Sequence, residues 1–175
     1  MVYGLGLALG LGIAACEPTD ESPEECGCFS AALDGIDYET SCEFASPCDT
    51  IEVQYDNDDE TATPVVDNPA ALNCALGVLG AGDAGSLFVE ERHSLGERYL
   101  SVFADGEGLA HVFVRDIEDL EDCGEGMKLY ELASTAYFDA CAQRDAPEEA
   151  YLCLLGGLRV TELETCWDAY CRPYI

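Results

Sequence analysis

The sequence predicts an α+β domain in which a helix packs on an antiparallel β-meander and further helices follow toward the C-terminus, with disulfides joining the parts. Three observations predict this class. Strand-like segments follow one another between residues 86 and 115, apolar residues on either side of them recur with the period of a helix, and the chain has eleven cysteines in 175 residues. The length suits one domain with its own core, which we place at residues 26–175.

The first core strand is predicted at residues 50–55, where apolar and polar residues alternate. This alternation directs Ile51, Val53 and Tyr55 toward the core. Residues 26–48, before the strand, contain four cysteines and few apolar side chains. We therefore expect local disulfides to hold that segment.

A helix is predicted to begin at Asn68 and Pro69, with the asparagine as N-cap and the proline in the first turn. One apolar stripe follows at i, i+3, i+4 and i+7, formed by Leu72, Ala75, Leu76 and Leu79. The glycine-rich residues 80–85 end the helix. The stripe predicts that this helix packs on a sheet.

The centre of the chain is predicted to be a meander of strands at residues 86–93, 98–104 and 109–115. The connections between them are too short for a crossover, so neighbouring strands must be antiparallel. Six aliphatic residues share the face that we expect to be buried: Leu87, Val89, Leu100, Val102, Val112 and Val114. Four aromatic residues fall on the other face, which is therefore either covered as well or open to a partner: Phe88, Tyr99, Phe103 and Phe113.

Acidic residues dominate positions 116–125, so we expect a solvated loop around Cys123. A further strand is predicted at residues 127–132, where apolar residues return. The sheet is expected to end there.

The period becomes helical after this strand. Ser134 is placed to cap a helix that runs to residue 144, and Pro147 opens a second helix, which the glycine pair 156–157 weakens or ends. The capping-box spacing of Thr161 and Glu164 predicts a third helix. Its apolar face would comprise Leu163, Cys166, Trp167 and Tyr170.

Residues 2–15 form an uncharged apolar run with four glycines, which is shorter than the roughly 20 residues that a membrane-spanning helix needs. Its length matches the apolar core of a secretory signal. The residues Ile13-Ala14-Ala15-Cys16 resemble the lipobox of bacterial lipoproteins. The resemblance implies that residues 1–15 are a cleaved signal peptide, that Cys16 carries the lipid, and that the protein is anchored in the bacterial cell envelope, on its periplasmic side or at the cell surface.

No basic residue precedes the apolar run, so either translation starts upstream of Met1 or the signal is atypical. An ordinary signal peptide and a buried N-terminal helix are the alternatives. Residues 16–25 contain five acids, two prolines and no large apolar residue. We expect them to be a flexible tether between the anchor and the domain.

Assigning Cys16 to lipid leaves ten of the eleven cysteines, an even number that suits up to five disulfides in an exported protein. Cys141 and Cys153 lie on the two arms of the predicted helical hairpin and are the pair that we expect. The spacing leaves the partners of the other eight open. They are Cys26, Cys28, Cys42, Cys48, Cys74, Cys123, Cys166 and Cys171. Zinc is disfavoured because Cys26 and Cys28 have C-x-C spacing and no second ligand pair follows.

The chain has 36 acidic and seven basic side chains and a formal charge of -29. Such a charge repels nucleic acid and anionic lipid, which excludes nucleic acid as a partner. Contact with a membrane is expected through the lipid anchor alone. A cationic protein surface or another envelope component remains possible.

Two weak chemical signals remain. Asp56, Asp58 and Glu60 begin like a calcium loop, but the sixth and twelfth positions do not match an EF-hand, so at most a weak Ca²⁺ site is expected. His93 and His111 could approach each other across the sheet, but no catalytic motif accompanies them. We therefore expect no catalytic residue and no cofactor, and favour a non-enzymatic binding module of the envelope over a Ca²⁺-binding surface protein and, after that, a hydrolase.

Overall fold

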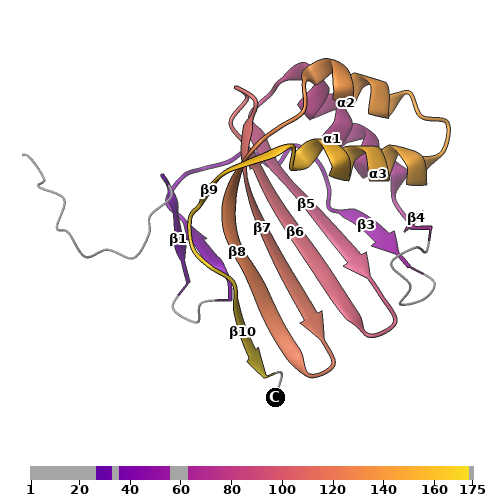
Figure 1. The fold of residues 1–175 in the computed structure, drawn as a ribbon. Helices are drawn as coiled ribbons and strands as arrows, with labels where there is room; N and C mark the ends of the chain where they lie inside the picture. Colours follow the sequence, from indigo (N-terminus) through magenta and orange to yellow (C-terminus); the bar gives the residue numbers. More distant parts are fainter. Residues whose placement is uncertain (1–26, 33–35, 56–62, 174–175) are drawn as a thin grey trace, which may run out of the picture.

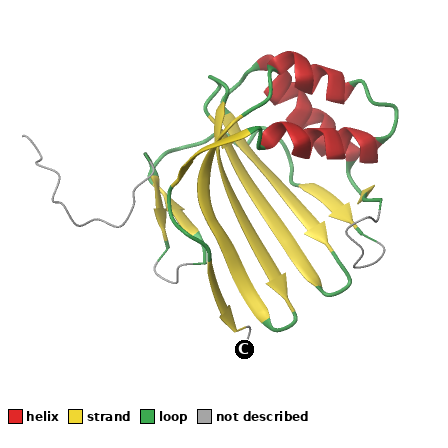
Figure 2. Ribbon diagram, viewed as in Figure 1, coloured by secondary structure: helices red, strands yellow, loops and turns green. Residues whose placement is uncertain are grey.

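The computed structural model describes residues 27–32, 36–55 and 63–173, which form the expected α+β domain (Figures 1 and 2). The strands in this part of the chain are β1 (Phe29–Ala31), β2 (Tyr38–Thr40), β3 (Ile51–Gln54), β4 (Val65–Val66), β5 (Gly85–Arg92), β6 (Gly96–Ala104), β7 (Leu109–Glu118), β8 (Glu121–Glu131), β9 (Thr161–Thr165) and β10 (Tyr170–Pro173). The helices are α1 (Pro69–Ala81), α2 (Thr135–Ala142) and α3 (Pro147–Leu158).

The main sheet is built around β5, β6, β7 and β8, whose antiparallel pairing confirms the predicted meander. The full order is β10-β8-β7-β6-β5-β3-β4, and β9 also pairs with β8. β3 runs parallel to β5, because the chain crosses over between them through α1. The sheet as a whole is therefore mixed.

The three helices lie on one face of this sheet, and the β5–β6 and β7–β8 hairpins extend beyond them (Figure 1). The six aliphatic residues predicted to face inward are buried here, each 4% exposed or less. The apolar stripe of α1 packs on them, together with Phe138 of α2 and Tyr151 of α3. This layer forms the larger of two cores.

The opposite face of the sheet is covered by the β1–β2 hairpin. Its Phe29 packs against Phe103 with ring centroids 4.8 Å apart, and Tyr38 packs against Phe113 at 5.1 Å. Phe103 and Phe113 are consequently buried. Of the two readings of this aromatic face, the structure shows the covered one.

Four disulfides join pairs of cysteines within the described residues. Cys141–Cys153 links α2 to α3, as the helical hairpin predicts, and Cys123–Cys171 links β8 to β10. Cys28–Cys42 closes the β1–β2 hairpin, a local disulfide as predicted for residues 26–48. Cys48 of the same segment instead bonds to Cys74 of α1. Cys166 is also in a disulfide, and its partner lies outside the described residues. The domain is therefore disulfide-rich, as expected.

The acidic segment 116–125 is not the solvated loop that composition predicts. β7 continues to Glu118 and β8 begins at Glu121, so only a tight turn separates them. Asp122 is 1% exposed because arginine side chains bind its carboxylate. Pairing with basic residues from other strands allows these acids to enter the sheet.

The predicted third helix is wrong. The chain from Thr161 onward forms β9 and β10, both paired with β8. Two residues of the expected apolar face, Leu163 and Tyr170, are about half exposed, so the helical spacing does not correspond to a buried face. Sheet pairing and the Cys123–Cys171 bridge outweigh the local helix signal.

Two helix ends also differ from expectation. The side chain of Asn68 makes no capping bond. It accepts from the Glu52 amide at 2.8 Å and donates to the Thr50 carbonyl at 2.6 Å, which fastens the start of α1 to β3. α3 continues through Gly156 and Gly157 to Leu158. The glycines are needed for contact between helices rather than for ending one.

We predict that Gly157→Ala lowers the free energy of unfolding of the domain by about 1 to 2 kcal/mol, despite the better helix propensity of alanine. A Cβ at this position would lie 2.6 Å from a ring carbon of Phe138 and 2.7 Å from one of Tyr137. Denaturant unfolding with the disulfides intact measures the effect. The control is Gly77→Ala in α1, where a Cβ meets nothing within 4 Å. The control should gain about 0.5 to 1 kcal/mol, and equal stability of the two variants would contradict the packing argument.

Candidate functional site

Several residues singled out from the sequence lie outside the described part of the chain. These are Cys16 with the rest of the lipobox, Cys26, and the calcium candidates Asp56, Asp58 and Glu60. The Ca²⁺ alternative therefore stays a prediction.

The two histidines are not brought together. In the sheet register, His111 pairs with Phe103, and Phe103 pairs with Ser86 at the start of β5. His93 follows the other end of β5. Ser86, at the register position of His111, and His93 are seven residues apart along the strand direction, or about 23 Å. His93 stacks on Tyr55 at 4.5 Å between ring centroids, and His111 packs against Phe29 at 4.8 Å, where burial lowers its pKa. The geometry gives no support to a hydrolase that uses both histidines.

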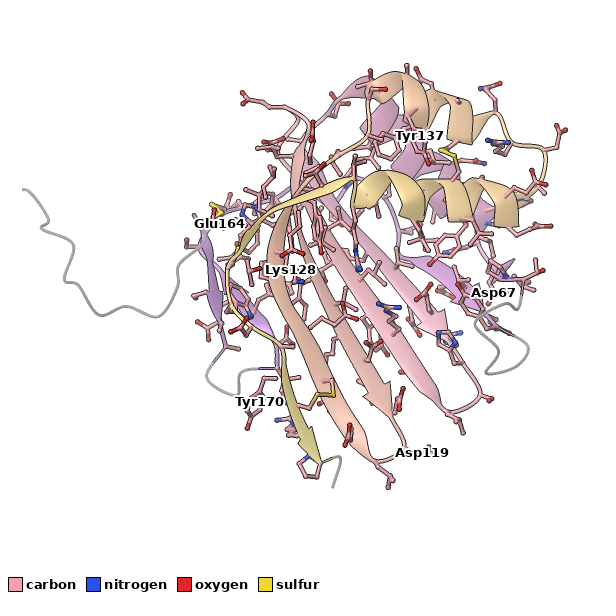
Figure 3. All side chains as sticks on the ribbon, in the orientation of Figure 1. Asp67, Asp119, Lys128, Tyr137, Glu164 and Tyr170 are labelled. Atoms are coloured by element: carbon pink, nitrogen blue, oxygen red, sulfur yellow. A yellow bond between two sulfur atoms is a disulfide. The ribbon has the colours of Figure 1, made fainter. Side chains whose placement is uncertain are left out.

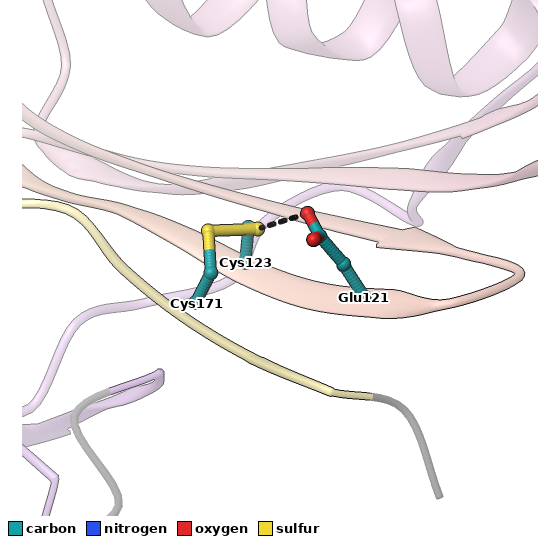
Figure 4. A group of neighbouring side chains, drawn as sticks. All are labelled: Glu121, Cys123 and Cys171. Carbon is teal, nitrogen blue, oxygen red and sulfur yellow. Dashed lines mark hydrogen bonds between the residues drawn. A yellow bond between two sulfur atoms is a disulfide. The ribbon is translucent and has the colours of Figure 1, made fainter.

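Glu121, Cys123 and Cys171 form a group of the kind that can hold a metal ion, with ligand atoms within 4.8 Å of one another (Figure 4). The two sulfur atoms are bonded to each other as a disulfide. A disulfide lacks the thiolate that binds metals, so this group is a poor metal site. Its disulfide links β10 to β8 covalently. The nine cysteines in the described residues are all in disulfides, so this part of the chain offers no thiol for catalysis.

A carboxylate is buried where β5 meets α3. Glu91 is 4% exposed and accepts hydrogen bonds from the Tyr151 hydroxyl at 2.5 Å and the Tyr55 hydroxyl at 3.1 Å. Burial first, and then the charge of Glu91, raises the pKa of both hydroxyls far above the usual range, so they remain protonated donors. Arg98 lies 3.9 Å from the same carboxylate and 3.3 Å from Asp116. These contacts satisfy the buried charge, and we interpret the cluster as structural.

A second ionic cluster holds β10 against the sheet. Arg115 donates to both oxygens of Asp122 at 2.9 Å, and Arg172 donates to one of them at 3.0 Å. The hydrogen bond from Arg115 is the main reason that the pKa of Asp122 lies below its usual range. Asp37 of the β1–β2 segment also pairs with Arg115, at 3.3 Å. One buried acid thus connects strands from three parts of the chain.

Basic side chains are almost all engaged in such internal contacts. Arg159 lies over the Tyr130 ring, with its guanidinium carbon 5.9 Å from the ring centroid. Five other basic residues form ion pairs with acids: Arg92, Arg98, Arg115, Lys128 and Arg172. These account for six of the seven basic residues of the chain. Acids therefore dominate the exposed surface, where their side chains project from strands and turns alike, as at Asp67, Asp119 and Glu164 (Figure 3).

A hollow of about 640 Å³ opens at the end of the sheet that lies nearest the start of α2. Four elements surround it: the end of α1, the β6–β7 turn, the segment from the end of β8 to α2, and β9. The lining residues are Leu79, Gly82, Asp83, Ala104, Gly106, Glu107, Gly108, Leu109, Glu131, Leu132, Ala133, Ser134, Thr135, Phe138 and Leu163. We call this site the hollow.

Turn geometry explains why the hollow forms here. Gly82 ends α1 in the left-handed region, and Gly106 of the β6–β7 turn also has a positive φ. The turn is fixed by Asp105, whose side chain accepts from the amides of Glu107 and Leu109. A Cβ at Gly106 would lie 3.1 Å from backbone atoms of the α1–β5 connection, so the two turns approach more closely than bulkier residues allow.

The floor of the hollow is apolar and its rim is acidic. Leu79, Ala104 and Phe138 are buried in the core beneath it, and Leu163 of β9 stands half exposed at its edge. Asp83, Glu107 and Glu131 are its exposed charged residues. Its lining contains no histidine, cysteine, lysine or arginine. Such a surface can bind an apolar group but has no paired base and nucleophile for catalysis.

The hollow cannot be recognised from the sequence, because its lining comes from segments that are far apart in the chain. In the sequence, the glycine-containing residues 80–85 and 105–108 indicate only the end of a helix and the connection between two strands. Only the fold brings them side by side. The predicted third helix places Leu163 on a buried face, so its exposure at the hollow was not expected from the sequence.

Comparison with known proteins found no matching family model, no matching curated protein and no matching solved structure. None of the helices in the described residues is long and apolar enough to cross a membrane. The disulfides are consistent with a domain that folds outside the reducing cytoplasm.

We predict that Asp122→Asn lowers the free energy of unfolding at pH 7 by about 2 kcal/mol, because two arginines lose charged hydrogen bonds. The lowered pKa of Asp122 stabilises the folded state above about pH 4, and this contribution is lost as the pH falls through the folded-state value. The variant should therefore lose less stability than the wild type below about pH 4.

Denaturant unfolding across this pH range measures both effects. Asp119→Asn is the matched control, because Asp119 is exposed at the tip of the β7–β8 turn (Figure 3). It should change stability by less than about 0.5 kcal/mol. The same acid sensitivity in Asp122→Asn and wild type would show that the cluster does not couple to pH.

Proposed function

We propose that this chain is an exported, lipid-anchored, acidic domain of the bacterial cell envelope that binds a ligand in the hollow and catalyses no reaction. The observation that carries the proposal is the hollow itself, which has an apolar floor and a lining with no basic or thiol side chain. Its volume falls in the range of about 300 to 1,000 Å³ that is usual for small-molecule sites. The disulfides that join the elements of the domain suit a preformed site outside the cell.

The cysteine count supports the lipid assignment. Nine described cysteines are in disulfides, and the partner of Cys166 lies outside the described residues, where Cys16 and Cys26 are the cysteines available. Ten of the eleven cysteines are then used, which leaves one for lipid. Two or three acyl chains on one residue hold a protein stably to a membrane, whereas one chain does not. The lipobox favours Cys16 for this role.

We predict that intact-mass analysis of the protein from a bacterial membrane finds a mature N-terminus at Cys16 with the added mass of acyl chains. Cys16→Ser is the control and should carry no acyl mass. Recovery of an intact Met1 on the unmodified wild-type chain would rule out the lipoprotein assignment.

Ligand capture is tested with the uncharged dye Nile red, whose fluorescence rises in apolar sites. The protein is residues 16–175, the whole mature chain under this proposal, with Cys16→Ser so that no lipid competes. Leu163→Ser should weaken dye binding about fivefold, because about 1 kcal/mol of apolar contact is lost.

Leu152→Ser is the matched control. Leu152 on α3 and Leu163 are each 51% exposed, but only Leu163 lines the hollow. The control should bind the dye like the parent chain. Equal effects of the two substitutions would place the apolar site elsewhere and refute binding in the hollow.

A further inference from the structure

We propose that the ligand of the hollow is an organic cation with an apolar chain, an alkylammonium in its simplest form. The apolar part would occupy the floor and the positive group would lie among the carboxylates of the rim. This inference rests on the proposed function, since it names the class of ligand for the same site.

The rim carries three acids that come from three different elements. Asp83 follows α1, Glu107 lies in the β6–β7 turn and Glu131 ends β8. In the described residues none of the three forms an ion pair, although acids elsewhere on the sheet do. The nearby basic residues have other partners: Lys128 pairs with Glu162 at 3.1 Å, and Arg159 lies over the Tyr130 ring. The rim is therefore an uncompensated negative charge beside an apolar surface.

The spacing of these acids favours an organic cation over a metal ion. The group of potential ligands within 4.8 Å of one another in the described residues is Glu121, Cys123 and Cys171, and the rim acids form no such group. A divalent ion needs several oxygen atoms at about 2 to 2.6 Å from one point. Carboxylates spread around an opening instead attract a diffuse cation such as an ammonium group.

The start of α2 is the feature that argues against a cation. Ser134 and Thr135 line the hollow at this helix terminus, which carries a positive partial charge of about half a unit. Ser134 partly offsets it, because its side chain accepts from the Tyr137 amide at 3.3 Å. Three full negative charges outweigh what remains, so an anionic ligand would be repelled.

A series of ligands with one chain and three head groups tests the class: octylammonium, octanol and octanoate. Calorimetric titration of the mature chain carrying Cys16→Ser, at about 50 mM salt, should show octylammonium binding about tenfold more tightly than octanol, and octanoate more weakly than both. Raising the salt to about 0.5 M should reduce the difference to about threefold or less. Octylammonium binding no tighter than octanol overturns the inference.

Rim variants locate the effect. Glu107→Gln with Glu131→Gln should weaken octylammonium about fivefold and leave octanol unchanged. The matched control is Glu43→Gln with Glu149→Gln, since both residues are exposed and neither lines the hollow. This control should leave both affinities unchanged. An equal loss in the rim and control variants would mean that the preference for cations comes from the overall charge of the protein and would overturn the rim assignment.

The two proposals fail in different ways. If Leu163→Ser weakens Nile red but octanoate or octanol binds as well as octylammonium, the hollow binds apolar ligands and only the cation class is wrong. If Leu163→Ser leaves Nile red binding unchanged, the proposed function fails together with the inference.

Discussion

Apolar side chains on both faces of β6 and β7 impose the architecture of this domain. Val102 and Val112 face the helices, whereas Phe103 and Phe113 face the other way, so neither side of the sheet can be left to water. The helices cover the first face and the small β1–β2 hairpin covers the second. Each cover carries a disulfide, Cys141–Cys153 between two of the helices and Cys28–Cys42 at the β1–β2 hairpin, which restricts the unfolded chain.

Charge is divided between the interior and the surface in an unusual way. Four arginines lie in strands of the sheet: Arg92, Arg98, Arg115 and Arg172. Arg98 and Arg115 pair with acids of neighbouring strands, which allows segments of acidic composition to fold. Little positive charge then remains to balance the exterior. The acidic rim of the hollow follows from the same division, because none of its carboxylates forms an ion pair within the described residues. The same composition, with many acids and few basic residues, thus explains both the ion pairs within the sheet and the acidic rim of the hollow.

The sequence was sufficient for the parts of the fold that depend on local periodicity. The stripe Leu72 to Leu79 and the alternation in β5, β6 and β7 reflect burial directly, so these elements were predictable. The segment around Asp122 was not, because its burial depends on Arg115 and Arg172 from other strands. The helical spacing of Leu163 and Tyr170 was a coincidence that strand pairing overrides. The hollow required the complete fold, since its lining is assembled from four separated segments.

The outer strands of the sheet have a consequence for crowding. Under the proposed lipid anchor, copies of the protein would meet at high density on the membrane, where unpaired strand edges favour association between copies. One edge here ends in β4, which is only two residues long. The other is formed by β9 and β10, with Glu162 and Glu164 in the first and Pro173 in the second. Short length, like charge and a missing amide all disfavour addition of another strand. The strands that complete the fold therefore also disfavour edge-to-edge association, as the proposed anchoring of many copies on one membrane would require.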